Sequence, residues 1–407
     1  MKEWIPGWGY RETDFSLFPI YAENETQRLW FYNNLYSDTL RLRFSNRYGR
    51  ETLPLEQVSI SLCTEQGRIE PDTSVTVRFC GKPGVRLEPG QVLCSDSVEF
   101  HAEPGTWISV SLYIKEKTRI TCAISSQSLL VTGMACQSGG NFCLAQTVAG
   151  ERFLDNARYF MALKPLYNIV AAALTQVEFL CENAREITTV TVFGDSITQH
   201  GNWSEALTRR LYAAAPGRAA VINRGICGNR VLHDASIRSK FGGYFGEGAL
   251  ERFEEDVYGA PGNRVDCVIL EEGINDIIQP FDGTCPQYEK VNAQDILSGY
   301  RAIAQLAHNH GSRLLGATIM PFRGFNAVWN AESEQMRLDI NRELKREVIF
   351  DTLLDFAAVV ADPEDGTRLA PAWDCGDHLH PNAAGGQAIA DSIELTNILK
   401  GKGETDA

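Results

Sequence analysis

A serine follows an uncharged β-forming run near the middle of the chain, in the stretch VTVFGDSITQH at residues 190–200. Val190 to Phe193 is followed directly by Gly194-Asp195-Ser196. An apolar run that ends at a glycine is typical of a buried strand closed by a sharp turn. A serine in such a turn could act as a nucleophile, with its own N–H facing a developing oxyanion. Taken alone, the tripeptide is common, and a plain strand–turn–helix junction in which Ser196 only caps the helix is the favoured interpretation.

Two further segments carry hydrogen-bond donors of the kind that stabilise negative charge. The glycine in Asn223 to Gly228 lets the backbone approach a ligand closely, so the Gly228 N–H could be offered to an oxyanion. Asn275 follows a third apolar run, and its side-chain amide could donate in the same way. Each segment alone is equally compatible with an ordinary turn, in which Gly228 permits the bend and Asn275 caps it.

A histidine-rich segment near the C-terminal end supplies acid–base groups. Asp377 and His380 stand three residues apart and could form the carboxylate–imidazole pair that removes a serine proton. A solvated polar turn, or a metal site using His378 and His380, remains open. Two histidines with one aspartate and no supporting cluster are a weak metal signal, so we expect no metal.

The second half of the chain alternates strand-like and helix-like patterns. Such alternation predicts a parallel sheet covered by helices on both faces, an α/β domain with three layers. In such sheets the ligand site lies beyond the carboxyl ends of the strands, which is where the segments above fall. The expected strands are 190–193, 219–223, 265–270 and 313–319, and the expected helices are 203–215 with Ser204 as N-cap, 292–310, 333–347 and 382–399.

The first half has a different pattern. From about residue 25 to 180, apolar and polar residues alternate in short runs separated by Gly and Pro, as in Leu40 to Ser45 and Trp107 to Ile114. This pattern predicts an all-β sandwich or jelly roll. Cys181 to Arg185 is interpreted as the linker, which gives domains of residues 1–185 and 186–407. Aromatic residues of the first domain could stack on sugar rings, but filling the core is the favoured interpretation for Trp4, Trp8, Tyr10, Trp30, Phe31 and Tyr32.

Composition restricts the partners. With 38 Lys and Arg against 52 Asp and Glu, the net charge of −14 argues against a nucleic-acid or anionic-membrane partner. We find no apolar run long enough to span a membrane and expect no membrane insertion. An odd number of cysteines, 11, without C-x-x-C spacing argues against a disulfide framework. Together with the absence of a secretory h-region in the first residues, this predicts a cytoplasmic protein.

The four chemical segments, in this order, resemble the SGNH hydrolase superfamily, also called the GDSL esterase/lipase group. The matching blocks are Gly194-Asp195-Ser196-Ile197, Asn223 to Gly228, Gly273-Ile274-Asn275-Asp276 and Asp377-His378-Leu379-His380-Pro381, within about residues 188–400. The resemblance implies a flavodoxin-like fold and no cofactor. It also implies Ser196 as nucleophile, His380 as general base and Asp377 as its orienter. The Ser196 N–H, the Gly228 N–H and the Asn275 amide would form the oxyanion hole.

The pairing of a β-sandwich with such a domain is similar to bacterial carbohydrate esterases of an arylesterase/acylhydrolase-like branch. This resemblance implies removal of acetyl or other small acyl groups from plant-derived carbohydrates of the xylo-oligosaccharide type. A lipase or lysophospholipase of the same group is the alternative within the enzyme class. A non-catalytic carbohydrate-binding protein is the alternative from another class. Fold-level similarity does not decide among these substrates.

Overall fold

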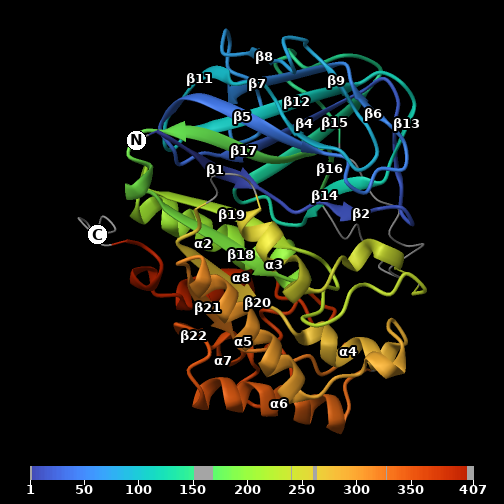
Figure 1. Cartoon of the computed structure of the whole chain (residues 1–407), viewed down its shortest axis with the longest axis vertical. Helices are drawn as coiled ribbons and strands as arrows, with labels where there is room; N and C mark the ends of the chain where they lie inside the picture. Colours follow the sequence, from blue (N-terminus) through green and yellow to red (C-terminus); the bar gives the residue numbers. More distant parts are fainter. Residues whose placement is uncertain (1, 151–167, 240, 260–263, 327, 401–407) are drawn as a thin grey trace. The chain divides into compact units, whose positions relative to one another are not determined.

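The computed structural model describes residues 2–150, 168–239, 241–259, 264–326 and 328–400 (Figure 1). Contacts divide the chain into two compact units, one comprising the residues up to Ile187 together with Tyr212–Ile222, the other Thr188–Leu211 together with the residues from Asn223 onward. The sequence predicts two domains, residues 1–185 and 186–407, that each fold independently. Contacts do not test independent folding, so this division stays a prediction.

The first unit is built from antiparallel strands in two five-stranded sheets, accompanied by smaller sheets of two or three strands (Figure 1). The first sheet contains β1 (Glu3–Gly9), β17 (Leu174–Cys181), β5 (Ser37–Ser45), β10 (Val92–Cys94) and β11 (Val98–Ala102). The second contains β15 (Thr132–Ser138), β4 (Glu25–Tyr32), β12 (Trp107–Ile114), β7 (Gln57–Cys63) and β8 (Val75–Val77). The shorter strands are β2 (Thr13–Asp14), β3 (Ile20–Ala22), β6 (Leu53–Leu55), β9 (Val85–Leu87), β13 (Thr118–Ile120), β14 (Cys122–Ser126) and β16 (Ile169–Ala172).

The period-two pattern has the expected physical basis in β5. Leu40, Leu42 and Phe44 are fully buried, whereas the alternating Arg41 and Arg43 are partly exposed. The predicted β-sandwich is therefore confirmed.

Aromatic side chains of this unit fill its interior, which was the favoured interpretation. Trp8, Tyr10 and Phe31 are buried, and the rings of Trp8 and Phe31 stack with centroids 5.4 Å apart. The Trp30 ring lies against Gly67 and Gly133, where a Cβ would overlap it. Trp8, Tyr10 and Phe31 are therefore part of the core, whereas Trp4, Trp30 and Tyr32 are partly exposed.

A five-stranded sheet has the order β19-β18-β20-β21-β22, and all of its strands except most of β19 belong to the second unit (Figure 1). Its strands are β18 (Thr188–Gly194), β19 (Ala219–Gly225), β20 (Cys267–Glu271), β21 (Arg313–Ala317) and β22 (Thr352–Leu354). The pairs from β18 through β22 are parallel, and every residue of β18 is buried. This is the flavodoxin-like order 2-1-3-4-5, in which the strand order reverses between β18 and β20. Ligands bind at such a switch point, beyond the carboxyl ends of the two strands.

Helices and one-turn 3₁₀ segments connect these strands. The helices are α1 (Ser196–Gln199), α2 (Asn202–Ala214), α3 (Ala249–Tyr258), α4 (Ile274–Asp282), α5 (Ala293–Asn309), α6 (Ala331–Arg346), α7 (Phe356–Val360) and α8 (Ala383–Ser392). The 3₁₀ segments are η2 (Ala184–Glu186), η3 (Gly242–Phe245), η4 (Gln287–Glu289) and η5 (Leu395–Asn397). Across the described residues, every helix is too short or too polar to cross a lipid bilayer.

Capping explains where the long helices begin. Asn292 and Asn330 each accept hydrogen bonds from the first turn of α5 and α6 and complete a capping box. Ser204 was expected to cap the helix at 203–215, which is wrong, because α2 already begins at Asn202 and the Ser204 hydroxyl donates to Thr198 O instead. The helix expected at 382–399 ends at Ser392, and η5 follows it.

We predict that Gly316→Ala destabilises the second unit. Gly316 lies in β21, where an added Cβ would overlap the buried ring of Phe350. Because overpacking a filled core costs roughly 1–3 kcal/mol, the free energy of unfolding should fall by about that amount in a urea titration. Gly366→Ala is the matched control, since nothing lies within 4 Å of its added Cβ. Equal stability of the two variants would contradict this account of the packing.

Candidate active site

The turn after β18 places Ser196 at the start of a helix. Gly194 ends the strand where a Cβ would overlap the Glu271 carbonyl oxygen of β20, so only glycine lets the two strand ends approach. The Asp195 side chain caps α1 by accepting a hydrogen bond of 2.9 Å from Ile197 N. Ser196 is the first residue of α1, and its N–H is one of the amides that a helix start leaves without an intrahelical acceptor.

Hydrogen bonds join three of the predicted site residues in series. Ser196 Oγ lies 2.8 Å from His380 Nε2, and His380 Nδ1 lies 2.6 Å from Asp377 Oδ2. The other Asp377 oxygen accepts from the backbone N–H groups of Leu379 and His380, each at 2.9 Å. These bonds fix the carboxylate and orient the imidazole, so an alcohol, an imidazole and a carboxylate are in contact in the order required for proton transfer.

The predicted oxyanion donors are tied to the same turn. Asn275 lies in the first turn of α4, and its amide donates to Asp195 Oδ2 at 3.0 Å, which leaves its second amide hydrogen available. Gln279 of α4 holds the Gly228 carbonyl at 2.6 Å. Within the described residues, the N–H groups of Ser196 and Gly228 donate to no protein acceptor.

Glycine is required at position 228 for two reasons. Its φ is +73°, in the left-handed region, and an added Cβ would overlap the ring of Phe245. The segment before it is held to the turn that carries Ser196, because Ile226 N donates to Gly194 O at 2.9 Å. The structure therefore connects all three predicted donor segments to one turn.

With this geometry established, sequence comparison identifies the family. Residues 192–388 match the GDSL-like Lipase/Acylhydrolase family. This part of the chain is a GDSL-like acylhydrolase domain. This match supports a hydrolase of carboxylic esters. Among curated proteins, none is significantly similar to the chain in sequence.

Solved structures that resemble the acylhydrolase domain cover about half of the chain. Axe2, an acetylxylan esterase from Geobacillus stearothermophilus, is 20% identical over 53% of this chain and 97% of its own, with a TM-score of 0.39. A GDSL-like lipase from Bacteroides thetaiotaomicron is 18% identical over 53% of this chain and 89% of its own, with a TM-score of 0.37. Similarity at this level does not extend to a substrate.

Charge and hydrogen bonding couple the pKa values of Asp377 and His380. Burial raises the pKa of Asp377, but the charge of His380 and the hydrogen bonds lower it further, and the net pKa is well below the usual value. Burial lowers the pKa of His380, yet the charge and hydrogen bond of Asp377 raise it more, and the net pKa lies above 6.5. Asp377 therefore stays ionised and stabilises the imidazolium.

Two further histidines lie beside the acylhydrolase site in different roles. His378 is exposed, and its Nδ1 lies 2.7 Å from Asp374 Oδ2, so it has its own carboxylate. His200 is buried, and its ring centroid lies 4.5 Å from that of His380. Burial and the charge of His380 lower the pKa of His200 well below its usual value, so this ring stays neutral. Its position one helical turn after Ser196 was the sequence signal for this contact.

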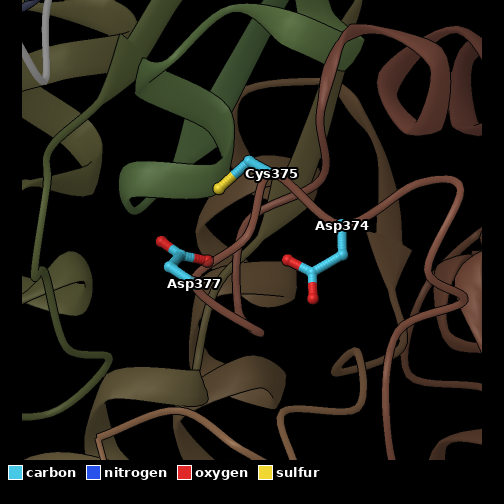
Figure 2. Close-up of side chains that lie close together, drawn as sticks. All are labelled: Asp374, Cys375 and Asp377. Carbon is cyan, nitrogen blue, oxygen red and sulfur yellow. The ribbon is translucent and has the colours of Figure 1, made fainter. Parts of the chain in front are cut away.

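The loop that carries Asp377 also groups three potential metal ligands. Asp374, Cys375 and Asp377 each place one ligand atom within 4.8 Å of the others, and Figure 2 shows the Cys375 thiol beside the Asp377 carboxylate. Burial and the charge of Asp377 raise the pKa of the Cys375 thiol to about 12. A cation bound at Asp377 would compete with the His380 imidazole for that carboxylate.

Sequence reasoning missed a buried group of charges behind the acylhydrolase turn. Glu271 and Glu272 are fully buried, and burial raises the pKa of both well above the usual value. Burial also raises the pKa of Asp195 to about 7. Arg252 of α3 is buried among them and lies 3.9 Å from Glu272. Two acids at the end of an apolar run were the available signal for the glutamates, whereas an arginine inside a helix carries no such signal.

We predict that the His380 ring titrates above pH 6.5 and that Asp377→Asn lowers its pKa. The substitution removes the charge that raises the pKa and leaves the burial that lowers it. NMR titration of histidine-labelled protein measures both values, and the signal absent from His380→Ala assigns the resonance among seven histidines. A wild-type midpoint below 6.5, or no change in Asp377→Asn, would contradict the coupling of the two residues.

Proposed function

We propose that the protein is a serine esterase that hydrolyses carboxylic esters through an acyl-enzyme, with Ser196 as nucleophile, His380 as general base and Asp377 as orienter of the imidazole. The observation that supports this most strongly is the continuous hydrogen-bonded series from Ser196 Oγ through His380 to Asp377. A serine hydroxyl is a poor nucleophile until a base takes its proton, and the imidazole needs its carboxylate to hold the correct tautomer.

The proposed reaction proceeds in two halves. His380 Nε2 accepts the Ser196 proton as Oγ attacks the ester carbonyl, and the new oxyanion accepts hydrogen bonds from the Ser196 and Gly228 N–H groups and the Asn275 amide. Collapse of this intermediate releases the alcohol, which takes its proton from His380. Water then attacks the acyl group on Ser196, with His380 as base again, and releases the carboxylic acid.

For the substrate we propose small acyl groups, acetyl above all, on plant-derived carbohydrates of the xylo-oligosaccharide type. This proposal rests on the pairing of a β-sandwich with the acylhydrolase domain, which resembles carbohydrate esterases. If the predicted cytoplasmic location holds, the substrate is an imported oligosaccharide and not the polymer. A lipase is the alternative, and it requires a groove for a long acyl chain.

We predict that Ser196→Ala and His380→Ala abolish turnover of p-nitrophenyl acetate, because each removes a participant in bond formation. Asn275→Ala should lower kcat about 10²- to 10³-fold, the usual loss for one oxyanion donor. His378→Ala is the control, since its ring binds Asp374 and not Ser196, and it should keep substantial activity. Near-wild-type activity of purified Ser196→Ala, or equal losses in the two histidine variants, would overturn the assignment.

We predict further that activity is highest on acetate in a series of p-nitrophenyl esters from acetate to palmitate. An esterase for small acyl groups gains nothing from a long chain, whereas a lipase gains binding energy with each buried methylene, about 0.8 kcal/mol. The steady-state kcat/KM of each ester measures the preference. Highest activity on palmitate would favour the lipase, and no burst or turnover on any ester would favour a non-catalytic carbohydrate-binding protein.

A further inference from the structure

One guanidinium group lies at the centre of the backbone that surrounds the nucleophile. The Arg252 side chain of α3 is fully shielded from solvent. Its Nη1 donates to Arg224 O and to Asp256 Oδ2, each at 2.8 Å, and its Nε donates to Asn229 Oδ1 at 2.9 Å. Its Nη2 donates to Gly194 O at 3.0 Å, and its Cζ lies 4.0 Å from the centroid of the Phe193 ring.

These acceptors belong to the two segments that carry the backbone oxyanion donors. Gly194 stands two residues before Ser196, so a bond to its carbonyl restrains the turn that aims the Ser196 N–H. Arg224 O and Asn229 lie on either side of Gly228. One planar group therefore holds both segments at a fixed separation.

A second set of contacts extends this restraint to the position of Gly228. The Asn229 amide, held by Arg252, donates to Phe245 O at 2.8 Å and Glu247 O at 2.7 Å. The Phe245 ring packs on Gly228 so closely that a Cβ there would overlap it. Arg252 is thus linked through Asn229 and Phe245 to the peptide that carries the Gly228 N–H.

We propose that Arg252 is a positioning residue that sets the spacing between the Ser196 and Gly228 oxyanion donors. This inference rests on the proposed function, since it assigns a role only if these N–H groups bind an oxyanion. Arg252 touches no substrate. It acts through the backbone of the two donor segments, and a displacement of about 1 Å in a reacting site can cost about 100-fold in rate.

Lysine cannot reproduce this arrangement although it keeps the charge. The guanidinium offers five N–H donors in a rigid fork, and four of them are used in short bonds to acceptors on different segments. An ammonium has three donors on one flexible stem and cannot bridge acceptors so far apart. Arg252→Lys therefore keeps a positive charge beside Asp256 and Glu272 while it removes the hydrogen bonds to the two donor segments.

A merely structural arginine provides the matched control. Arg337 of α6 is also buried, pairs with Glu334, and donates to Ile319 O and Gly366 O, and none of these groups lies in a donor segment. Arg337→Lys removes a comparable set of bonds from the same unit. If the two variants lose a similar amount of Tm, a difference in kcat or boronate inhibition between them reports on the geometry of the site and not on the stability of the unit.

The test measures Arg252→Lys and Arg337→Lys with p-nitrophenyl acetate and with phenylboronic acid, whose tetrahedral adduct with a serine carries an oxyanion-like charge. Arg252→Lys should lower kcat roughly 10- to 100-fold with KM changed less than about 3-fold, and should weaken boronate inhibition by a similar factor. Arg337→Lys should change neither value more than about 3-fold, because a loss of stability alone leaves the folded site intact.

If Arg252→Lys does not fold, Asn229→Ala breaks only the branch toward Gly228 and should still weaken boronate inhibition. Equal boronate affinity and kcat in the Arg252 and Arg337 variants, or wild-type values in Asn229→Ala, would overturn the inference and leave the esterase assignment intact. Full activity of Ser196→Ala would instead remove the proposed function itself, so the two failures are distinguishable.

Discussion

The hydrogen bond between Ser196 and His380 is the interaction on which the rest of the domain depends. It joins two residues 184 positions apart, one in the turn after the first strand of the sheet and the other in the loop before the last helix. Nothing local in the sequence brings these residues together. The parallel sheet does so, because the carboxyl ends of its strands lie at one edge. Both residues lie beyond that edge, near the point where the strand order reverses.

Burial and neighbouring charges shift the carboxyl groups around this bond in opposite directions. Asp377 remains ionised beside the imidazole, whereas burial raises the pKa of Glu271 and Glu272 well above the usual value. The guanidinium of Arg252 then serves as the cation of this interior and as the brace between its backbone segments.

Sequence alone could predict the residues proposed to act on the substrate but not the residues that support them. Ser196, Asn275 and His380 stand at strand ends or beside a proline-bounded turn, where residue type and order are informative. Arg252 lies within a helix, where arginine ordinarily faces water, and only the fold reveals its burial. Helix α4 was missed because Gly273 and Pro280 indicate a loop, although Gly273 precedes the helix with φ of +114° and Pro280 lies inside it.

Reaction with a fluorophosphonate, followed by peptide mass spectrometry, tests the central claim most directly. The reagent forms a stable bond only with a serine whose proton has been taken by a neighbouring base and whose oxyanion is stabilised. We expect a single adduct on Ser196 in the wild type and none in His380→Ala. An adduct on another residue, or persistent ester hydrolysis by protein that carries the label on Ser196, would contradict the account.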